Sequence, residues 1–385
     1  MGIRIAAMKV VGCIAILISI SLPATRQIPA LYARDTTSHH DDATVRIGVL
    51  GLFHPKEIRL SAAATGAAVL TADTQTMILE KSSGSDSVSV QISGAKMIVT
   101  AGRRTLQASR IVVVGRNGGP VDFTLSIPGR ITRHYQGTLE IVPTESHLTV
   151  IVTMDREAAV ASVVAAESDP DAPPEALKAQ AVAARSYLAS GPGRHFEFDF
   201  CDTTHCQFLR EPPGPESAAA NATAATRNLV LAYNSRPLRA MYTRSCPGQT
   251  HTPAQLGMTS TEYPYYPADC AYCRAHPQRW TSRIASSDAA TLRAHDESSR
   301  LHIDRFLGWG TVPGNDFQET KQDDEVVLHG TGFGHGIGLC QAGAKAMARD
   351  GSTFREILLH YYPNTSLVDV ADVSIQGRSR PTPAN

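Results

Sequence analysis

The stretch SVVAAESDPDAPPEALKAQAVAARSYL, residues 162–188, decides how the chain is organised. An apolar run ends at Glu167, prolines interrupt the chain, and an alanine-rich segment begins at Pro174. Proline at the first helical position and a glutamate, here Glu175, in the first turn are both favoured where a helix begins. The residues that follow are almost all strong helix formers, and Leu177, Ala181, Ala184 and Leu188 form an apolar stripe. We therefore expect a helix over 174–189 with one buried stripe.

Glu167 stands alone in front of this helix. The preceding residues VVAA predict an apolar wall, and desolvation there would raise the carboxyl pKa, as a general acid near neutral pH requires. Lys178 and Arg185 lie on one face of the helix, about 10 Å apart, and a cationic pair would suit an anionic substrate. From spacing alone, a solvated glutamate at a helix end, with Lys178 and Arg185 as solvated charges, is the stronger interpretation.

Around this segment the pattern predicts an α+β fold, with a β-rich module followed by a mixed α/β domain with glycine-rich loops. Residues 45–151 contain short β-branched runs bounded by turn residues. Asp155 is a good N-cap for a helix that leads to Glu167. Further helices are expected at 215–232, 288–308, 342–351 and 353–363, with a strand at 325–330. We place the β-rich module at 45–136, the mixed domain at 137–375 and a disordered tail at 376–385.

The N-terminus has the pattern of a secretory signal peptide. Arg4 and Lys9 precede an apolar run over 10–22, followed by small residues. The run is shorter than a membrane-spanning helix needs, although a retained anchor stays an alternative. We expect a signal peptide at 1–33, a linker at 34–44, and a secreted or envelope location. The formal net charge of zero predicts no bulk attraction to nucleic acid.

Six cysteines lie beyond the predicted signal peptide, an even number that permits disulfides or metal binding. HFEFDFCDTTHCQ contains His195, Cys201 and Cys206, whose side chains are of the kind that binds zinc; a Cys201–Cys206 disulfide is the competing interpretation. The pair in CAYC, Cys270 and Cys273, fits a redox pair, a disulfide, or half a zinc site completed by Cys201 and Cys206.

Two glycine-rich segments complete the candidate sites. They are SCPGQT, residues 245–250, and GFGHGIGLCQAGA, residues 332–344. Glycines let backbone approach a ligand closely, and His335 and Gln341 could supply polar contacts. The second segment is not a nucleotide-binding motif because no βαβ unit surrounds it. A tight turn before a helix is the alternative.

Taken together, PEALKAQAVAARSYL, CDTTHCQ, SCPGQT and GTGFGHGIGLCQAGAKAMARDG resemble the SpoIID/LytB family, over about residues 137–370. The resemblance implies a peptidoglycan lytic transglycosylase, which cuts the β-1,4 bond between N-acetylmuramic acid and N-acetylglucosamine and leaves a 1,6-anhydro sugar. Glu167 matches the place of the catalytic glutamate, with Glu175 as its nearest rival. The alternative is a non-catalytic glycan-binding protein that stimulates an N-acetylmuramoyl-L-alanine amidase. The implied partners are peptidoglycan glycan strands and such an amidase.

The resemblance also implies roles for the other residues. Lys178 and Arg185 would orient the glutamate or bind the lactyl carboxylate of muramic acid. The same cleft would be lined by Ser245, His335 and Gln341. The segment with His195, Cys201 and Cys206 resembles a zinc site of some members; any metal there would be structural, and catalysis would need no cofactor. Cys246 and Cys340 stand where other members commonly have serine, which suggests a disulfide between their loops. The alternative is a pair of free thiols near the cleft, which would put the implied substrate contacts in doubt.

Overall fold

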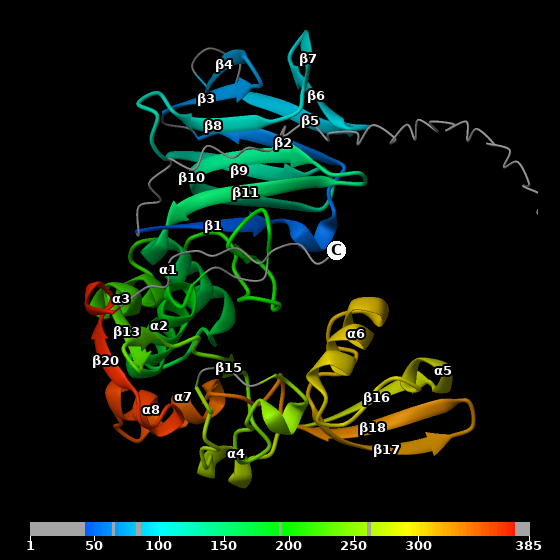
Figure 1. Cartoon of the computed structure of the whole chain (residues 1–385), viewed down its shortest axis with the longest axis vertical. Helices are drawn as coiled ribbons and strands as arrows, with labels where there is room; N and C mark the ends of the chain where they lie inside the picture. Colours follow the sequence, from blue (N-terminus) through cyan, green and yellow to red (C-terminus); the bar gives the residue numbers. More distant parts are fainter. Residues whose placement is uncertain (1–42, 64–65, 82–85, 192–194, 260–262, 374–385) are drawn as a thin grey trace, which may run out of the picture. The chain divides into compact units, whose positions relative to one another are not determined.

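The computed structural model describes residues 43–63, 66–81, 86–191, 195–259 and 263–373. The predicted signal peptide, most of the predicted linker and the predicted tail lie outside these ranges. Within them, no helix combines the length and the apolar character needed to cross a bilayer. The fold is α+β, as predicted, with a β-rich N-terminal part followed by a mixed α/β part (Figure 1).

The β-rich part is one continuous antiparallel ladder system around a single hydrophobic core. In spatial order its main path runs β1, β11, β10, β9, β2, β5, β6, β7, while β8 joins β10 to β3 and β3 pairs with β4. Alternate residues face the core, as in β8, where Ile111 and Val113 are fully buried. The strands are β1 (Thr44–Val49), β2 (Glu57–Ala62), β3 (Ala67–Ala72), β4 (Gln75–Glu80), β5 (Ser87–Ser93), β6 (Lys96–Ala101), β7 (Arg104–Ala108), β8 (Ile111–Gly115), β9 (Val121–Ile127), β10 (Ile131–Pro143) and β11 (Leu148–Asp155).

The β-rich part extends further than the boundary predicted at residue 136. That boundary falls inside β10, whose first half pairs with β9 and whose second half pairs with β11. Gly137 lies at the changeover, where a Cβ atom would come within 2.2 Å of the Thr153 carbonyl oxygen. The glycine is therefore required by a close backbone approach inside a strand, and it does not mark the end of a domain.

Two helices follow β11 directly. Helix α1 (Arg156–Glu167) begins at Asp155, whose carboxylate accepts a hydrogen bond from the Ala158 N–H at 3.0 Å, as the sequence predicted. Helix α2 (Pro174–Ala189) has Pro174 in its first turn, also as predicted. The four residues of the predicted stripe are all buried, but nearly every other side chain from Ala176 onward is buried too. Helix α2 is thus a central helix surrounded by the rest of the domain.

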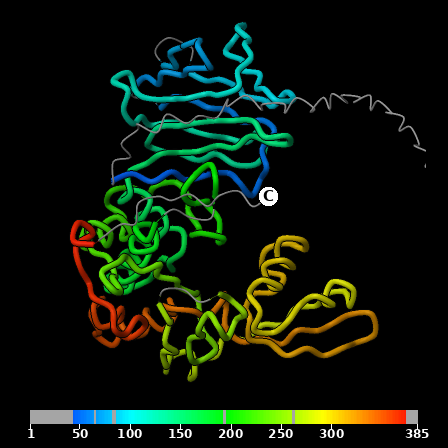
Figure 2. The backbone as a smooth tube through the Cα atoms, viewed as in Figure 1, coloured from blue at the N-terminus to red at the C-terminus, as the bar shows by residue number. Residues whose placement is uncertain are grey.

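The helix predicted over 215–232 is shorter. Helix α3 (Ala218–Ala225) ends before Asn228, which has a left-handed φ of 63°, and β13 (Leu229–Tyr233) follows. Strand β13 pairs with β14 (Arg236–Pro237) and with β20 (Ser366–Asp369) near the C-terminal end of the described chain. Figure 2 shows the red C-terminal segment running beside this green segment. The apolar run LVLAY is a strand because β20 supplies its partner.

The remaining elements support the pocket described below. Parallel strands β15 (Tyr242–Thr243) and β19 (Leu339–Cys340) pair, and helices α7 (Gln341–Arg349) and α8 (Phe354–Tyr361) follow. The strand predicted at 325–330 is β18 (Glu325–Thr331), between β16 (Arg279–Ala285) and β17 (Asp316–Gln322). The helix predicted over 288–308 is interrupted at His295, where φ is 58°, and becomes α5 (Ser286–Ala289) and α6 (Glu297–Leu307). Two further elements are short: α4 (Ala271–Ala275) and β12 (Phe200–Cys201).

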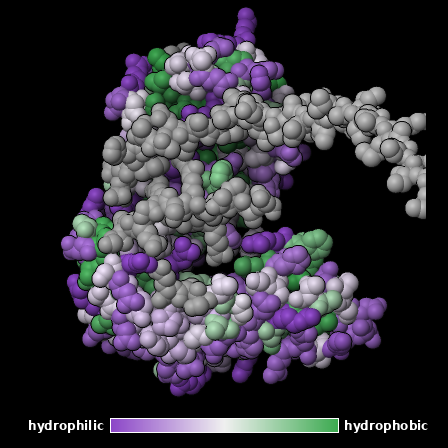
Figure 3. All heavy atoms as spheres, in the orientation of Figure 1, coloured by the Kyte–Doolittle hydropathy of each residue, from purple (hydrophilic) through white to green (hydrophobic). Residues whose placement is uncertain are grey.

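The surface in view is largely hydrophilic, and one of its apolar areas lies near α6 (Figure 3). Phe306 is 76% exposed, and Leu307 and Trp309 are also exposed at the C-terminal end of this helix. The opposite side of α6 holds a buried ion-pair network, in which Arg300 binds Glu297 and Asp304. Helix α6 is therefore fixed by buried charge as much as by apolar contact.

A second buried ion pair joins the central helices. The Arg185 guanidinium, fully buried in α2, donates from Nε and Nη2 to the two carboxylate oxygens of Glu157 on α1, both at 2.7 Å. It also donates to the carbonyl oxygens of Thr223 on α3 and Leu229 on β13. Four elements are thus held by one side chain whose position Lys could not fill, because only guanidinium offers this fork of donors.

Replacing Arg185 by Met should lower the free energy of unfolding by about 3–5 kcal/mol, because Glu157 would be left without its partner in a buried setting. Lys178→Met is the matched control: its pair with Glu175 is partly exposed, 27% and 31% for the two side chains, and its loss should cost less than about 1 kcal/mol. Chemical denaturation measures both, and equal losses would contradict a structural role for Arg185.

Candidate functional site

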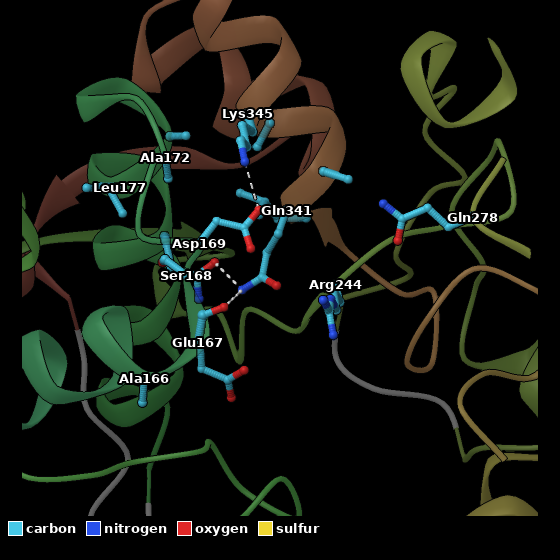
Figure 4. Close-up of a pocket in the computed structure, with 15 residues that line it drawn as sticks. Ala166, Glu167, Ser168, Asp169, Ala172, Leu177, Arg244, Gln278, Gln341 and Lys345 are labelled. Atoms are coloured by element: carbon cyan, nitrogen blue, oxygen red, sulfur yellow. Dashed lines mark hydrogen bonds and ion pairs between the residues drawn. The ribbon is translucent and has the colours of Figure 1, made fainter. Parts of the chain in front are cut away.

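A polar pocket of about 340 Å³ lies where the end of α1 meets α2, β19, α7 and the loop after β15. Figure 4 shows polar side chains from these segments pointing toward one another. It is lined by Ala166, Glu167, Ser168, Asp169, Ala172, Ala176, Leu177, Gln180, Arg244, Gln278, Leu339, Gln341, Ala342, Ala344 and Lys345. Two of the residues singled out from the sequence, Glu167 and Gln341, are among them.

Glu167 is the last residue of α1 and the lining residue whose chemistry stands out. Burial raises the pKa of its carboxyl to about 7, even though hydrogen bonds with the Phe208 N–H and with the Tyr242 side chain act in the opposite direction. The Phe208 N–H lies 2.8 Å from Oε1. Near neutral pH the carboxyl is therefore divided between its protonated and ionised forms, which suits a group that gives up a proton and takes one back.

Gln341 fixes the backbone around this carboxyl. Its side-chain amide donates to the Glu167 carbonyl oxygen at 3.2 Å and to the Gln180 side chain at 3.3 Å. The first turn of α7 is thereby attached both to the end of α1 and to the middle of α2. Gln341 thus lies in the predicted cleft, and its contacts are with protein groups that hold the acid in place.

A second carboxylate, Asp169, lines the same pocket in a different electrostatic setting. The Lys345 ammonium lies 2.9 Å from Asp169 and 2.6 Å from Asp171. Arg349 also pairs with Asp171 at 2.9 Å. In Figure 4 the Glu167 carboxylate points away from Asp169. Asp169 is 56% exposed and paired with a cation, whereas Glu167 is desolvated.

Arg244 supplies a cation on the opposite wall. Its side chain is exposed, lines the pocket, and lies with Cζ 5.5 Å from the centre of the Phe333 ring. Ser245, which was predicted to line the cleft, is buried one step behind: its hydroxyl donates to Gln278, a lining residue, at 3.1 Å. The pocket is therefore lined by Arg244, which precedes the SCPGQT segment, and by Gln278, which accepts the hydrogen bond from its serine.

Besides Ser245, three more predicted cleft residues are not in the pocket lining. Arg185 is fully buried and paired with Glu157, so it cannot contact a ligand in the pocket. Lys178 pairs with Glu175 at 2.6 Å, and Glu175 also accepts from the Phe354 N–H, so the nearest rival to Glu167 has a structural role. His335 accepts a hydrogen bond from the Ile337 N–H at 3.0 Å, and burial lowers its pKa to about 4.

The predicted metal ligands His195, Cys201 and Cys206 do come together, joined by His205. One ligand atom from each of the four lies within 4.8 Å of the others. Both cysteines are free, so the competing disulfide is not formed. Hydrogen bonds lower the pKa of the Cys201 thiol far below its usual value, and the one with Cys206 has the largest effect. The lowered pKa favours the thiolate, which is the form that binds a metal. The donor set fits zinc, and these four residues would hold it in a structural role.

This His195–Cys206 cluster adjoins the acid. Two residues after Cys206, the Phe208 N–H reaches Glu167. Between them, Gln207 donates to the Ala184 carbonyl oxygen in α2 at 3.3 Å and accepts from the Tyr242 hydroxyl at 3.0 Å. The cluster therefore adjoins the backbone segment whose N–H donates a hydrogen bond to the Glu167 carboxyl.

The disulfide suggested between Cys246 and Cys340 is not formed. Cys270 and Cys273 do not complete a site with Cys201 and Cys206, which was one of the possibilities left open by the sequence. Instead, Cys246, Cys270, Cys273 and Cys340 are free, buried and gathered in one cluster, their Sγ atoms all within 4.8 Å of one another. The expected disulfide was wrong, and the four cysteines gather because the CAYC segment folds beside the two glycine-rich loops.

Sequence reasoning missed Arg244, Asp169 and Lys345. Each lies close in sequence to a motif that it did find: Arg244 precedes SCPGQT, Asp169 follows Glu167 by two positions, and Lys345 is one helical turn beyond Gln341. Proximity to a motif was an available signal. Whether each side chain faces the pocket depended on packing that no local pattern reports.

One protein-family model and several known proteins match this chain. The family model described as stage II sporulation protein, SpoIID, matches residues 144–233, which include α1, α2, Glu167 and the His195–Cys206 cluster. An uncharacterized protein of Brachyspira hyodysenteriae is 28% identical over 268 residues, covering 61% of this chain and 72% of that protein. Stage II sporulation protein D of Bacillus subtilis is 24% identical over 249 residues, covering 54% and 73%. The amidase enhancer of Bacillus subtilis is 25% identical over 274 residues, covering 50% and 38%.

The fold and the pocket define an α+β protein with a lone desolvated carboxyl in a polar pocket. The sequence matches then support the resemblance to the SpoIID/LytB family that the motifs predicted.

The raised pKa of Glu167 should appear in the pH dependence of stability. Its folded value is about 7, against an ordinary value of 4.5. Between these pH values the folded chain keeps a proton that the unfolded chain has lost, so the Glu167 contribution to stability falls as the pH rises. The unfolding free energy of wild type relative to Glu167→Gln should fall by up to about 1.4 kcal/mol per pH unit in this window. Denaturation at a series of pH values measures it; parallel curves would contradict the raised pKa.

Proposed function

We propose that this protein is a peptidoglycan lytic transglycosylase with Glu167 as its acid and base. The carrying observation is a single desolvated carboxyl, with a pKa of about 7, in the wall of a polar pocket. The family and the relatives named for sporulation and amidase enhancement support a cell-wall-related function and an extracellular or envelope location. The reaction is the one that the resemblance to the SpoIID/LytB family implies, and the pocket supports it.

The chemistry balances with one carboxyl group. Protonated Glu167 gives its proton to the glycosidic oxygen between N-acetylmuramic acid and N-acetylglucosamine, and the bond from that oxygen to C1 of muramic acid breaks. The 6-hydroxyl oxygen of the same muramic acid then bonds to C1, and its proton passes to the Glu167 carboxylate. The products are a 1,6-anhydro muramic end and a free 4-hydroxyl, and no water is consumed. Because the nucleophile is tethered to the reacting ring, proximity supplies much of the rate.

The setting of Asp169 supports this over hydrolysis with two carboxylates. A retaining or inverting glycosidase needs a second carboxylate as nucleophile or as base for water. Asp169 is occupied by Lys345 and points away from the Glu167 carboxylate (Figure 4). The pocket thus offers one carboxyl suited to proton transfer, which is what an intramolecular attack requires.

Arg244 is the group we assign to the substrate's negative charge. A glycan strand without stem peptides carries a free lactyl carboxylate on each muramic acid. Arg244 is exposed on the pocket wall, whereas the cations proposed from the sequence, Lys178 and Arg185, are both engaged in protein ion pairs. A guanidinium can bind a carboxylate through two parallel hydrogen bonds.

Glu167→Gln should reduce formation of anhydro-muramic products by about 10²–10⁴-fold, the usual contribution of a positioned acid or base. The measurement is mass spectrometry of products from purified protein and stem-peptide-free glycan. Product formation that is unchanged in this variant would exclude Glu167 as the acid.

Asp169→Asn separates the two mechanisms in the same assay. If the tethered 6-hydroxyl is the nucleophile, this variant still gives anhydro ends. If Asp169 acts on water, wild type gives reducing ends and the variant gives neither product.

Arg244→Gln should lower kcat/KM on stem-peptide-free glycan by about tenfold to a hundredfold, through KM more than kcat, since it removes a charge-assisted hydrogen bond to the bound substrate. Lys178→Gln, which removes a cation outside the pocket lining, is the matched control and should change kcat/KM little. Equal effects of the two variants would indicate general attraction between charges, and our assignment of Arg244 would be wrong.

A second candidate function rests on the likeness to an amidase enhancer, which covers 50% of this chain. In that case the pocket would bind glycan strands without cutting them, and the protein would stimulate an N-acetylmuramoyl-L-alanine amidase. Wild type would then release no anhydro product from glycan, while the rate of added amidase on intact peptidoglycan would rise. That pair of results would replace the transglycosylase proposal.

A further inference from the structure

The cluster of Cys246, Cys270, Cys273 and Cys340 plays no part in the proposed reaction. The Sγ atoms of Cys273 and Cys340 are 3.6 Å apart, those of Cys270 and Cys340 are 4.0 Å apart, and all four lie within 4.8 Å of one another. All four residues belong to the buried core shared by α2, α7 and α8. The region matched by the family model ends at residue 233, before the first of them.

These distances suit four sulfurs around one ion. Zinc bound by thiolates has zinc–sulfur distances of about 2.3 Å, which places the corners of a tetrahedron about 3.8 Å apart. A disulfide needs about 2.05 Å between sulfurs, and all four cysteines are free. The spacing of Cys270 and Cys273, with two residues between them, is also that of half a structural zinc site.

Hydrogen-bond donors surround the sulfur atoms. The Cys340 sulfur accepts hydrogen bonds from the Cys246 N–H at 3.3 Å and from the Gly343 N–H at 3.5 Å. Cys340 is also the N-cap of the nine-residue helix α7, where the helix end stabilises negative charge. The Tyr361 hydroxyl donates to the Cys270 sulfur at 3.7 Å. Outer contacts of this kind orient and tune metal-bound thiolates.

The first turn of α7 packs tightly against the cluster. A Cβ atom on Gly343 would lie 2.6 Å from the Cys270 sulfur and 2.1 Å from the Tyr361 hydroxyl oxygen. The first turn of α7 therefore approaches the sulfurs as closely as a glycine permits. Such an approach brings the Gly343 N–H to the Cys340 sulfur.

We propose that Cys246, Cys270, Cys273 and Cys340 bind one zinc ion as a closed tetrahedral thiolate site. Four protein ligands leave no open position for substrate, so the ion is structural. It joins the loop after β15, helix α4 and the start of α7. Cys340 directly precedes Gln341, and Arg244 lies two positions before Cys246, so the site fixes one wall of the Glu167 pocket. The inference does not depend on which reaction the pocket performs.

The test measures metal content in the purified full chain and two double variants. Cys270→Ser/Cys273→Ser should lose one equivalent of zinc relative to wild type. Cys201→Ser/Cys206→Ser, the matched control in the other cluster, should retain zinc whose X-ray absorption shows sulfur ligands only, at about 2.3 Å. The control result stands even if the first variant fails to fold, because there the four proposed ligands are unaltered.

Three outcomes would overturn the proposal. One is unchanged zinc content in folded Cys270→Ser/Cys273→Ser. Another is nitrogen or oxygen among the ligands, or iron in place of zinc, in Cys201→Ser/Cys206→Ser. The third is peptide mapping of wild type, alkylated before reduction, that finds any of the four cysteines in a disulfide.

Discussion

The buried pair between Arg185 and Glu157 is the interaction on which the position of the candidate acid depends. Arg185 is fully buried, so its charge must be matched, and Glu157 matches it with both carboxylate oxygens. The pair fixes α1 against α2 near the start of α1. Glu167 lies at the other end of the same helix, and a rigid helix carries that constraint to the pocket. A cation proposed from the sequence to bind substrate instead determines where the acid is.

Much of the fold could be predicted because local patterns determine it. Alternating β-branched runs give the strands, Asp155 begins α1, and Pro174 begins α2. Prediction failed where a distant partner contributes: LVLAY is a strand that pairs over most of its length with β20. Among the site residues, Glu167 and Gln341 line the pocket, whereas Arg185 does not. An arginine on a helix looks the same in sequence whether it faces a ligand or a buried glutamate.

The two cysteine-containing clusters lie next to two backbone or side-chain groups that contact Glu167. The His195–Cys206 cluster precedes the Phe208 N–H that contacts Glu167, and the four-cysteine cluster adjoins Gln341, which contacts the Glu167 carbonyl oxygen. With zinc bound, as we propose, each cluster would fix a backbone segment on a different side of the acid. Sequence alone could group the cysteines only by their spacing along the chain. The second group forms across separations of up to 94 residues, between Cys246 and Cys340, which no spacing rule reaches.

The environment of Glu167 balances opposing effects, and the proposed chemistry needs that balance. Burial favours the protonated carboxyl, whereas the Phe208 N–H and the Tyr242 side chain stabilise the carboxylate. With burial alone the group would keep its proton, and with the hydrogen bonds alone it would ionise before meeting substrate. A lone group that must act first as acid and then as base works best when neither form is strongly preferred. A carboxyl at a helix end, desolvated yet within reach of two donors, satisfies that requirement without a second carboxylate.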